Sequence, residues 1–92
     1  PEIAEFTANS PAREAGLVVG DRIVSINGER VETFMDIPPR ILPFPGRTVD
    51  ITVARDGREI TVPVRIAETI ERDRFGNESR IGRVGVGAGR AE

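Results

Sequence analysis

Hydrophobic and polar residues alternate along three stretches of the chain, and this pattern predicts β-strands. The stretches are residues 22–26, 48–54 and 60–66, and in the last two the apolar side chains fall on one face. Asp56–Gly57 separates the last two stretches, and a two-residue turn of this composition is typical of a β-hairpin. Pro63 has no amide hydrogen, so the third stretch is expected to be an edge strand or to hold Pro63 where the ladder needs no donor.

The two ends of the chain carry weaker strand patterns. Residues 2–7 alternate and predict a first strand, with Ile3 and Phe6 as the candidates to face inward. Residues 81–87 interleave glycine with aliphatic residues and predict a last, glycine-rich strand. Residues 68–80 are strongly charged and predict an exposed hairpin tip or a mobile loop.

A short helix is predicted directly after the first strand. Ser10 can accept hydrogen bonds from the free amides of a helix start, and Pro11 suits the first helical position. Gly16 suits the left-handed conformation that ends a helix, which leaves Leu17 to enter the core. The chain then turns at Gly20–Asp21, where the aspartate side chain is expected to hydrogen bond to the backbone of its own turn.

A second short helix is predicted in a proline-rich segment. Two adjacent prolines fit only near a helix start, which favours Asp36 as the N-cap of a helix over residues 37–42. A start at Phe34, capped by Thr33, is the alternative, and it leaves at least one proline where a helical hydrogen bond is lost.

Composition narrows the function classes. The chain has 92 residues, 38% of them hydrophobic, and a net charge of −2, which fits one domain and offers no basic field for nucleic acid. No run of about 18 apolar residues occurs, so no membrane span is expected within the chain. Cysteine and histidine are absent, so the usual zinc ligands, the Ser-His pair and the Cys-His pair are missing and an independent enzyme is not expected. A chain without cysteine is also compatible with an oxidising compartment.

The segment Ser10 to Val31 reads SPAREAGLVVGDRIVSINGERV. It resembles the signature SPAxxAGLxxGDxIxxINGxxV of PDZ domains in bacterial envelope proteases. The resemblance implies an α+β fold: a small, five- to six-stranded antiparallel, partly open barrel with two short helices and the bacterial, circularly permuted strand order. It also implies a PDZ domain over residues 1–87, with residues 88–92 as a tail or linker.

The position of the glycine-rich strand points to one kind of PDZ domain. In the envelope serine proteases the corresponding loop precedes the Ser-Pro-Ala segment, whereas here Ile81–Val86 comes last. This order resembles the PDZ domain of bacterial site-2-type membrane zinc metalloproteases, which carry out regulated intramembrane proteolysis. The resemblance implies a periplasmic domain of an inner-membrane protein, with zinc in the parent protease and no cofactor in this domain.

The same resemblance implies a peptide-binding site. In PDZ domains a glycine-bearing loop directs backbone amides at a peptide's terminal carboxylate, and the following strand pairs with the peptide. The matching loop residues here are Arg83, Val84, Gly85 and Val86; a plain β-strand, with Arg83 merely solvated, is the alternative. Two apolar stripes of the second helix compete for the other groove wall. We assign Met35, Pro39 and Leu42 to the groove and Phe34, Ile37 and Ile41 to the core.

The expected function is therefore a non-catalytic module that binds a peptide or gates a protein substrate. The partner would be a peptide or protein substrate, including the free C-terminus of a cleaved membrane protein. A PDZ domain of an envelope serine protease or tail-specific peptidase is the alternative. A scaffold domain that pairs with another folded domain is a third interpretation.

Overall fold

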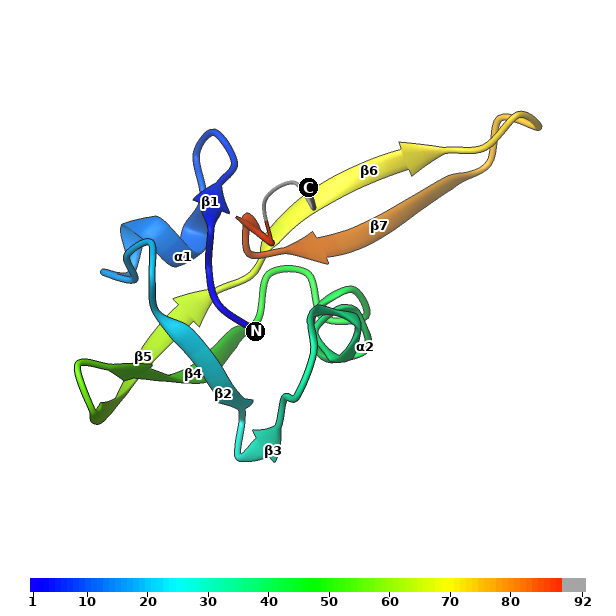
Figure 1. Ribbon diagram of the computed structural model, residues 1–92. Coiled ribbons are helices and arrows are strands. Elements are labelled where there is room, and N and C mark those ends of the chain that lie inside the picture. The colour runs from blue at the N-terminus through cyan, green and yellow to red at the C-terminus, as the bar shows by residue number, and fades with distance from the viewer. Residues whose placement is uncertain (89–92) are drawn as a thin grey trace.

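The computed structural model describes residues 1–88, so all but the first residue of the predicted tail, 88–92, lies outside the described residues (Figure 1). The elements follow in this order: β1 (Glu5–Phe6), α1 (Pro11–Glu14), β2 (Arg22–Ile26), β3 (Glu29–Arg30), the 3₁₀ turn η1 (Phe34–Asp36), α2 (Pro38–Ile41), β4 (Thr48–Arg55), β5 (Arg58–Arg65), β6 (Ala67–Arg72), β7 (Glu78–Arg83) and β8 (Val86–Gly87). The predicted antiparallel α+β architecture with two short helices is confirmed, and its sheets stay open rather than closing into a barrel.

The main sheet has the strand order β3-β2-β4-β5, with every neighbouring pair antiparallel. Its three longer strands are the ones predicted from alternation. Asp56 and Gly57 form the turn between β4 and β5 with φ angles of 51° and 78°, as a two-residue hairpin of this kind requires. Pro63 lies on the edge strand β5, so its missing amide hydrogen costs the ladder nothing.

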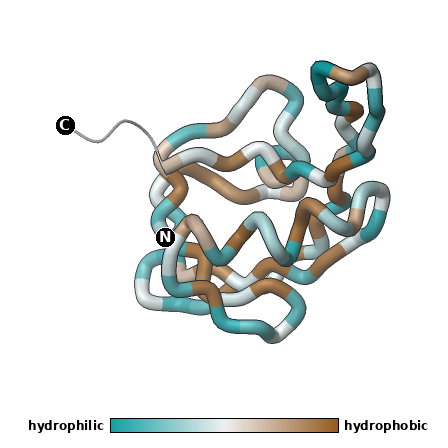
Figure 2. Tube along the Cα trace, turned by 90° about the vertical axis from the view of Figure 1, so that its right-hand side faces the viewer, coloured by the Kyte–Doolittle hydropathy of each residue, from teal (hydrophilic) through white to brown (hydrophobic). Residues whose placement is uncertain are grey.

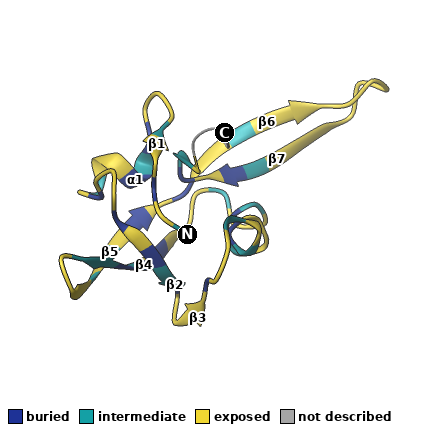
Figure 3. Cartoon of the chain, in the orientation of Figure 1, coloured by how far each residue is buried: buried dark blue, intermediate teal, exposed yellow. Residues whose placement is uncertain are grey.

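The core lies between this sheet, α1, α2 and the extended first segment of the chain. Figure 2 shows hydrophobic and hydrophilic residues alternating along the strands, and Figure 3 shows buried and less buried positions following one another along the strands of the main sheet. Ile3 is fully buried and Phe6 packs partly on the core, as predicted. Only residues 5 and 6 of the first segment form a strand, because Ile3 exchanges hydrogen bonds with the turn at Gly20 and Asp21 instead.

Helix α1 forms as its sequence predicts. The Ser10 hydroxyl accepts from the amide of Arg13 at 3.3 Å, and Pro11 occupies the first helical position. Gly16 has a φ of 104°, the left-handed conformation that ends the helix. Leu17 then enters the core and is 2% exposed.

Asp21 ties the turn after α1 to the end of β4. Its carboxylate accepts from the amide of Val18 at 3.0 Å, which confirms the predicted bond within the turn. The guanidinium of Arg55 adds two bonds that the pattern did not predict, Nε to Oδ1 at 2.7 Å and Nη2 to Oδ2 at 2.6 Å. These bonds from Arg55 lower the pKa of the Asp21 carboxyl despite its burial.

The proline-rich segment forms two consecutive turns, η1 and α2. The prediction of Asp36 as N-cap of the second helix is wrong, because its Oδ2 accepts from the amides of Glu32 and Thr33, each at 3.0 Å. Asp36 therefore closes the 3₁₀ turn that precedes the helix. The two prolines occupy the first positions of α2, where no intrahelical amide bond is needed.

The predicted glycine-rich strand 81–87 is not one strand. β7 pairs with β6 in a hairpin whose far end extends away from the body, and this confirms residues 68–80 as an exposed hairpin (Figure 1). The chain then breaks at Val84–Gly85, where Gly85 has a φ of 75°. β8 follows and pairs with β1, so the last strand lies beside the first. This junction between two small sheets shapes the site described next.

Candidate functional site

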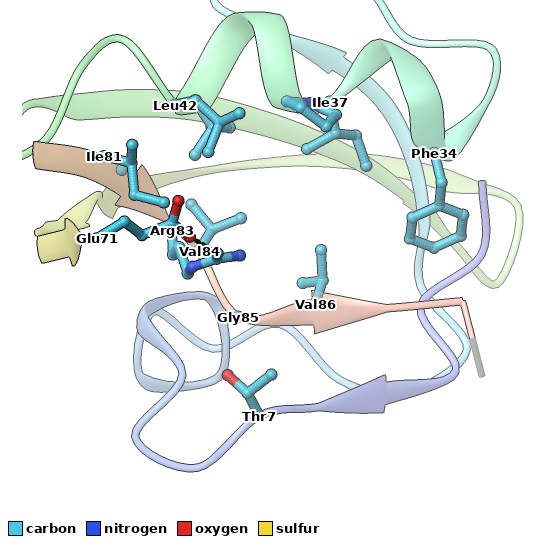
Figure 4. Close-up of a pocket in the computed structure, with 13 residues that line it drawn as sticks. Thr7, Phe34, Ile37, Leu42, Glu71, Ile81, Arg83, Val84, Gly85 and Val86 are labelled. Atoms are coloured by element: carbon cyan, nitrogen blue, oxygen red, sulfur yellow. Dashed lines mark hydrogen bonds and ion pairs between the residues drawn. The ribbon is translucent and has the colours of Figure 1, made fainter. Parts of the chain in front are cut away.

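A groove of about 360 Å³ lies between the η1–α2 segment and the junction of β7 with β8 (Figure 4). Most of the side chains that line it are apolar. The lining residues are Phe34, Ile37, Pro38, Ile41 and Leu42 on the helical side, Ile81 to Val86 on the strand side, and Thr7 and Glu71.

The backbone of the junction is held so that two amides face this groove. The carbonyl of Val84 accepts from the amide of Ala12 at 3.0 Å and from the Ser10 hydroxyl at 2.9 Å. The carbonyl of Gly85 accepts from the amide of Thr7 at 3.0 Å. In a trans peptide the C=O and the next N–H point in opposite directions. The amides of Gly85 and Val86 therefore point away from α1 and β1, on the side where the groove lies.

Glycine is required at position 85 for two reasons. Its positive φ is one that side-chain-bearing residues rarely adopt. A Cβ built there would also lie 2.6 Å from the Thr7 Oγ1 and 2.8 Å from the Ser10 side chain. A left-handed residue between differently oriented peptides is the usual backbone of an anion-binding nest. Gly85 therefore packs closely against Thr7 and Ser10 on one side of the junction, while the amides of Gly85 and Val86 face the groove on the other side.

Gly82, a residue that the candidate set did not include, brings β7 against the end of α2. Its amide donates to the carbonyl of Leu42 at 2.9 Å, and a Cβ there would collide with the carbonyl of Ile41. In the sequence, the only sign of this contact was a glycine directly before the loop residues 83–86. Gly82 therefore fixes how closely the helix and the strand side of the groove approach.

β8 is the edge strand of the groove. Within residues 1–88 it pairs only with β1, with Phe6 opposite Val86. Antiparallel ladders alternate, so the backbone groups of Val86 face the side opposite β1. The edge that remains open is therefore shorter than the strand predicted over residues 81–87. It begins after β7, because β7 pairs with β6 on one side and its Gly82 amide donates to Leu42 on the other.

The helical wall of the groove is formed mainly by the stripe that the sequence analysis assigned to the core. Phe34, Ile37 and Ile41 line the groove together with Leu42, the one residue of the assigned stripe that does. Met35 is 85% exposed and lies outside the groove, and Pro39 lines a separate depression next to Phe44. The assignment assumed that core and groove need opposite faces. One inward face serves both, because α2 sits at the rim of the core and covers its edge.

Arg83 lines the groove but does not offer a free positive charge. Its Nη2 lies 3.0 Å from Oε1 of Glu71, a residue of β6 that the sequence did not single out. Both side chains are about half exposed. Among the residues that the structure describes, these two are the only charged side chains lining the groove, so its charge balances to zero.

Comparison with known proteins supports the architecture. Residues 2–41 match the family model described as a PDZ domain. The fold also matches the crystal structure of the PDZ domain of the SdrC-like protein from Listeria monocytogenes, with a TM-score of 0.68 and 19% identity, over 92% of this chain and 82% of that chain. The chain has the PDZ fold. The strand order, with β8 beside β1, is the permuted one expected from the late glycine segment.

The relatives of this PDZ domain are named as proteases, and those of Mesorhizobium japonicum and Geobacillus kaustophilus are named as zinc metalloproteases. It is 40% identical over 86 residues to a putative zinc metalloprotease of Mesorhizobium japonicum, covering 94% of the chain and 23% of the relative. It is 39% identical over 77 residues to the zinc metalloprotease RasP of Geobacillus kaustophilus, covering 83% and 18%. The regulator of sigma-W protease RasP of Bacillus subtilis is 36% identical over 85 residues, covering 92% and 19%. The predicted resemblance to PDZ domains of site-2-type zinc metalloproteases is confirmed, and the chain spans less than a quarter of these relatives.

Two further observations concern the described part of the PDZ domain. None of its helices has the length and apolar character needed to cross a membrane. In residues 1–88 no three histidine, cysteine, aspartate or glutamate side chains come together as a metal site would require.

Proposed function

We propose that this PDZ domain binds the carboxyl end of an extended apolar peptide in the groove between α2 and β8. One observation carries the proposal: the amides of Gly85 and Val86 face an apolar groove that ends in an edge strand. The peptide would add to β8 as an antiparallel strand, with its terminal carboxylate at the amides of the loop. Its last side chain would enter the space between Leu42, Ile81 and Val84.

Binding of this kind is expected to be transient. Strand addition at β8 uses only a few backbone hydrogen bonds, since β8 itself is two residues long. A micromolar complex corresponds to about 8 kcal/mol on the 1 M scale. A module of this affinity suits selection among substrates that are delivered, cleaved and released.

We further propose that the domain is the non-catalytic, substrate-gating module of a membrane-embedded zinc metalloprotease that acts in regulated intramembrane proteolysis. The names of the relatives support this parent over an envelope serine protease or tail-specific peptidase. The chain has no histidine or cysteine and so does not fit a zinc centre itself; the metal would belong to another part of the parent. The domain would face the periplasm and bind the C-terminus left by a first cleavage, or exclude uncut substrates by their bulk.

The experiment is a titration of the ¹⁵N-labelled 92-residue chain with an acetylated hexapeptide that ends in valine. The free-carboxylate peptide is expected to shift the amide signals of Gly85 and Val86 and to saturate in the micromolar to millimolar range. The same peptide with an amidated end is the matched ligand. No shift at millimolar peptide, or equal shifts with both peptides, would refute carboxylate capture and leave steric exclusion as the gating mode.

A pair of variants tests where the peptide lies. Leu42→Ala removes an apolar side chain from the groove wall and is expected to weaken binding several-fold, since each buried CH₂ group contributes about 0.8 kcal/mol. Met35→Ala is the control, because Met35 is 85% exposed and does not line the groove. Equal effects of the two substitutions would contradict the placement of the peptide.

A further inference from the structure

The ion pair between Glu71 and Arg83 stands at one end of the groove. Figure 4 places both residues and Ile81 beside Leu42, while Phe34 lies at the opposite end of the helical wall. Arg83 is the last residue of β7 and directly precedes the segment whose amides face the groove. The pair therefore sits at the end where a bound peptide would place its terminal carboxylate.

The β6–β7 hairpin brings the two residues together. Arg83 lies opposite Ala67 in the register, and Glu71 is four residues further along β6. Side chains two and four residues apart on a strand share one face, so Glu71 and Arg83 project from the same side of the hairpin. The guanidinium of Arg83 reaches along the hairpin to Glu71, at 3.0 Å.

The other ion pairs of the hairpin provide a contrast. Arg72 pairs with Glu78 at 2.7 Å and Arg80 pairs with Glu68 at 3.4 Å, and none of these four residues lines the groove. Of the three ion pairs of the hairpin, the pair of Glu71 with Arg83 is therefore the one placed to interact with a charge bound at the loop amides. Both partners are about half exposed, so solvent and salt reach them.

We propose that Glu71 determines the selectivity of the groove by competing with the ligand's carboxylate for Arg83. This inference rests on the carboxylate binding proposed above. With Glu71 present, Arg83 is already partnered, and a peptide end gains contacts from the amides and the apolar wall but little from charge. Glu71 thereby lowers affinity for chain ends in general and makes binding depend on the apolar side chain that fills the groove.

The test compares Glu71→Gln with Glu78→Gln in the 92-residue chain. Both substitutions remove one negative charge from the same hairpin and break one exposed ion pair, but only Glu71 lines the groove. The probe is the acetylated hexapeptide ending in valine, with a free or an amidated end. Glu71→Gln is expected to tighten binding of the carboxylate peptide about two- to fivefold, the range of one exposed ion pair, and to leave the amidated peptide unchanged.

Two readouts separate this role from a structural one. The gain from Glu71→Gln should disappear in an Arg83→Gln background, because Glu71 acts through Arg83. It should also shrink at 1 M salt, where the screening length is about 3 Å. Equal affinities of the Glu71→Gln and Glu78→Gln chains, or an equal gain for the amidated peptide, would overturn the inference. Failure of the unmodified chain and of Glu78→Gln to bind the carboxylate peptide would instead refute the proposed function.

Discussion

Ser10→Ala is the substitution that most directly tests how the loop is held. The Ser10 side chain is buried and makes two hydrogen bonds. Its hydroxyl accepts from the Arg13 amide at 3.3 Å, as helix cap, and donates to the Val84 carbonyl at 2.9 Å. One side chain thus joins the start of α1 to the junction of β7 and β8. Alanine removes both bonds and leaves the backbone unchanged.

The expected loss in the free energy of unfolding follows from these two hydrogen bonds. The cap contributes about 0.5–1 kcal/mol, at the low end because the bond is long and α1 has only one turn. The bond to Val84 contributes about 1 kcal/mol, since the Val84 carbonyl keeps the Ala12 amide as a partner and is not left unsatisfied. We expect unfolding to become easier by about 1.5–2 kcal/mol, which lowers the melting temperature of a chain of this size by roughly 6–16 °C.

The assay is urea unfolding of the 92-residue chain, followed by circular dichroism. Ser79→Ala is the matched control, because Ser79 is exposed on β7 and makes no side-chain hydrogen bond within residues 1–88. The midpoint should fall for Ser10→Ala and stay constant for Ser79→Ala, with the same dependence on urea concentration in both. A difference below about 0.5 kcal/mol between the two variants would refute the assignment of two effective bonds to Ser10.

Three further predictions follow from other positions. Gly85→Ala is expected to abolish carboxylate binding and to destabilise the fold by more than Gly76→Ala does, because both residues have positive φ but only Gly85 lacks room for a Cβ; equal losses of stability in a melting experiment would contradict this. The Asp21 pKa is lowered in the fold, so its stabilisation is fully present above the unfolded value of about 3.9 and is lost as pH falls through the folded pKa. In the Arg55→Gln chain, the free energy of unfolding should therefore fall less steeply below about pH 4 than in the unmodified chain. The same pH dependence in both chains would count against a stabilising pair of Asp21 with Arg55. Phe75→Ser, at the 80% exposed hairpin tip, should leave both stability and peptide affinity within about 0.5 kcal/mol of the unmodified chain, as calorimetry and titration can check.

The elements set by local chemistry were predictable from the sequence. Strands with strict alternation, the turn at Asp56–Gly57 and the capped helix after Ser10 all formed where the pattern placed them. Each of these depends on neighbours within a few residues, so the sequence carries the whole signal. The late position of the glycine segment was also informative, because it fixed which strand lies beside β1.

The predictions that were wrong concern features that depend on contacts between segments distant in the sequence. Residues 81–87 alternate like one strand, but the bonds from Ser10 and Ala12 to Val84 bend the chain there. The choice between the two stripes of α2 depended on where the helix sits relative to the core, which no local pattern records. Glu71 joined the site only because the hairpin register brings it to Arg83. A charged run by itself gives no register.

The adjacency of β1 and β8 has a consequence for when the groove comes into being. The hydrogen bond between Ser10 and Val84 joins residues 74 positions apart. Almost the whole chain must therefore be ordered before the amides of Gly85 and Val86 are held facing the groove. Contacts of such long range are slow to form, because the entropy of a large loop is lost before they contribute. The main sheet can form earlier from its consecutive strands, whereas a nascent or prematurely ended polypeptide has no competent groove. The proposed peptide binding would therefore require both ends of the domain to be in place, and it would be lost as soon as β1 and β8 separate.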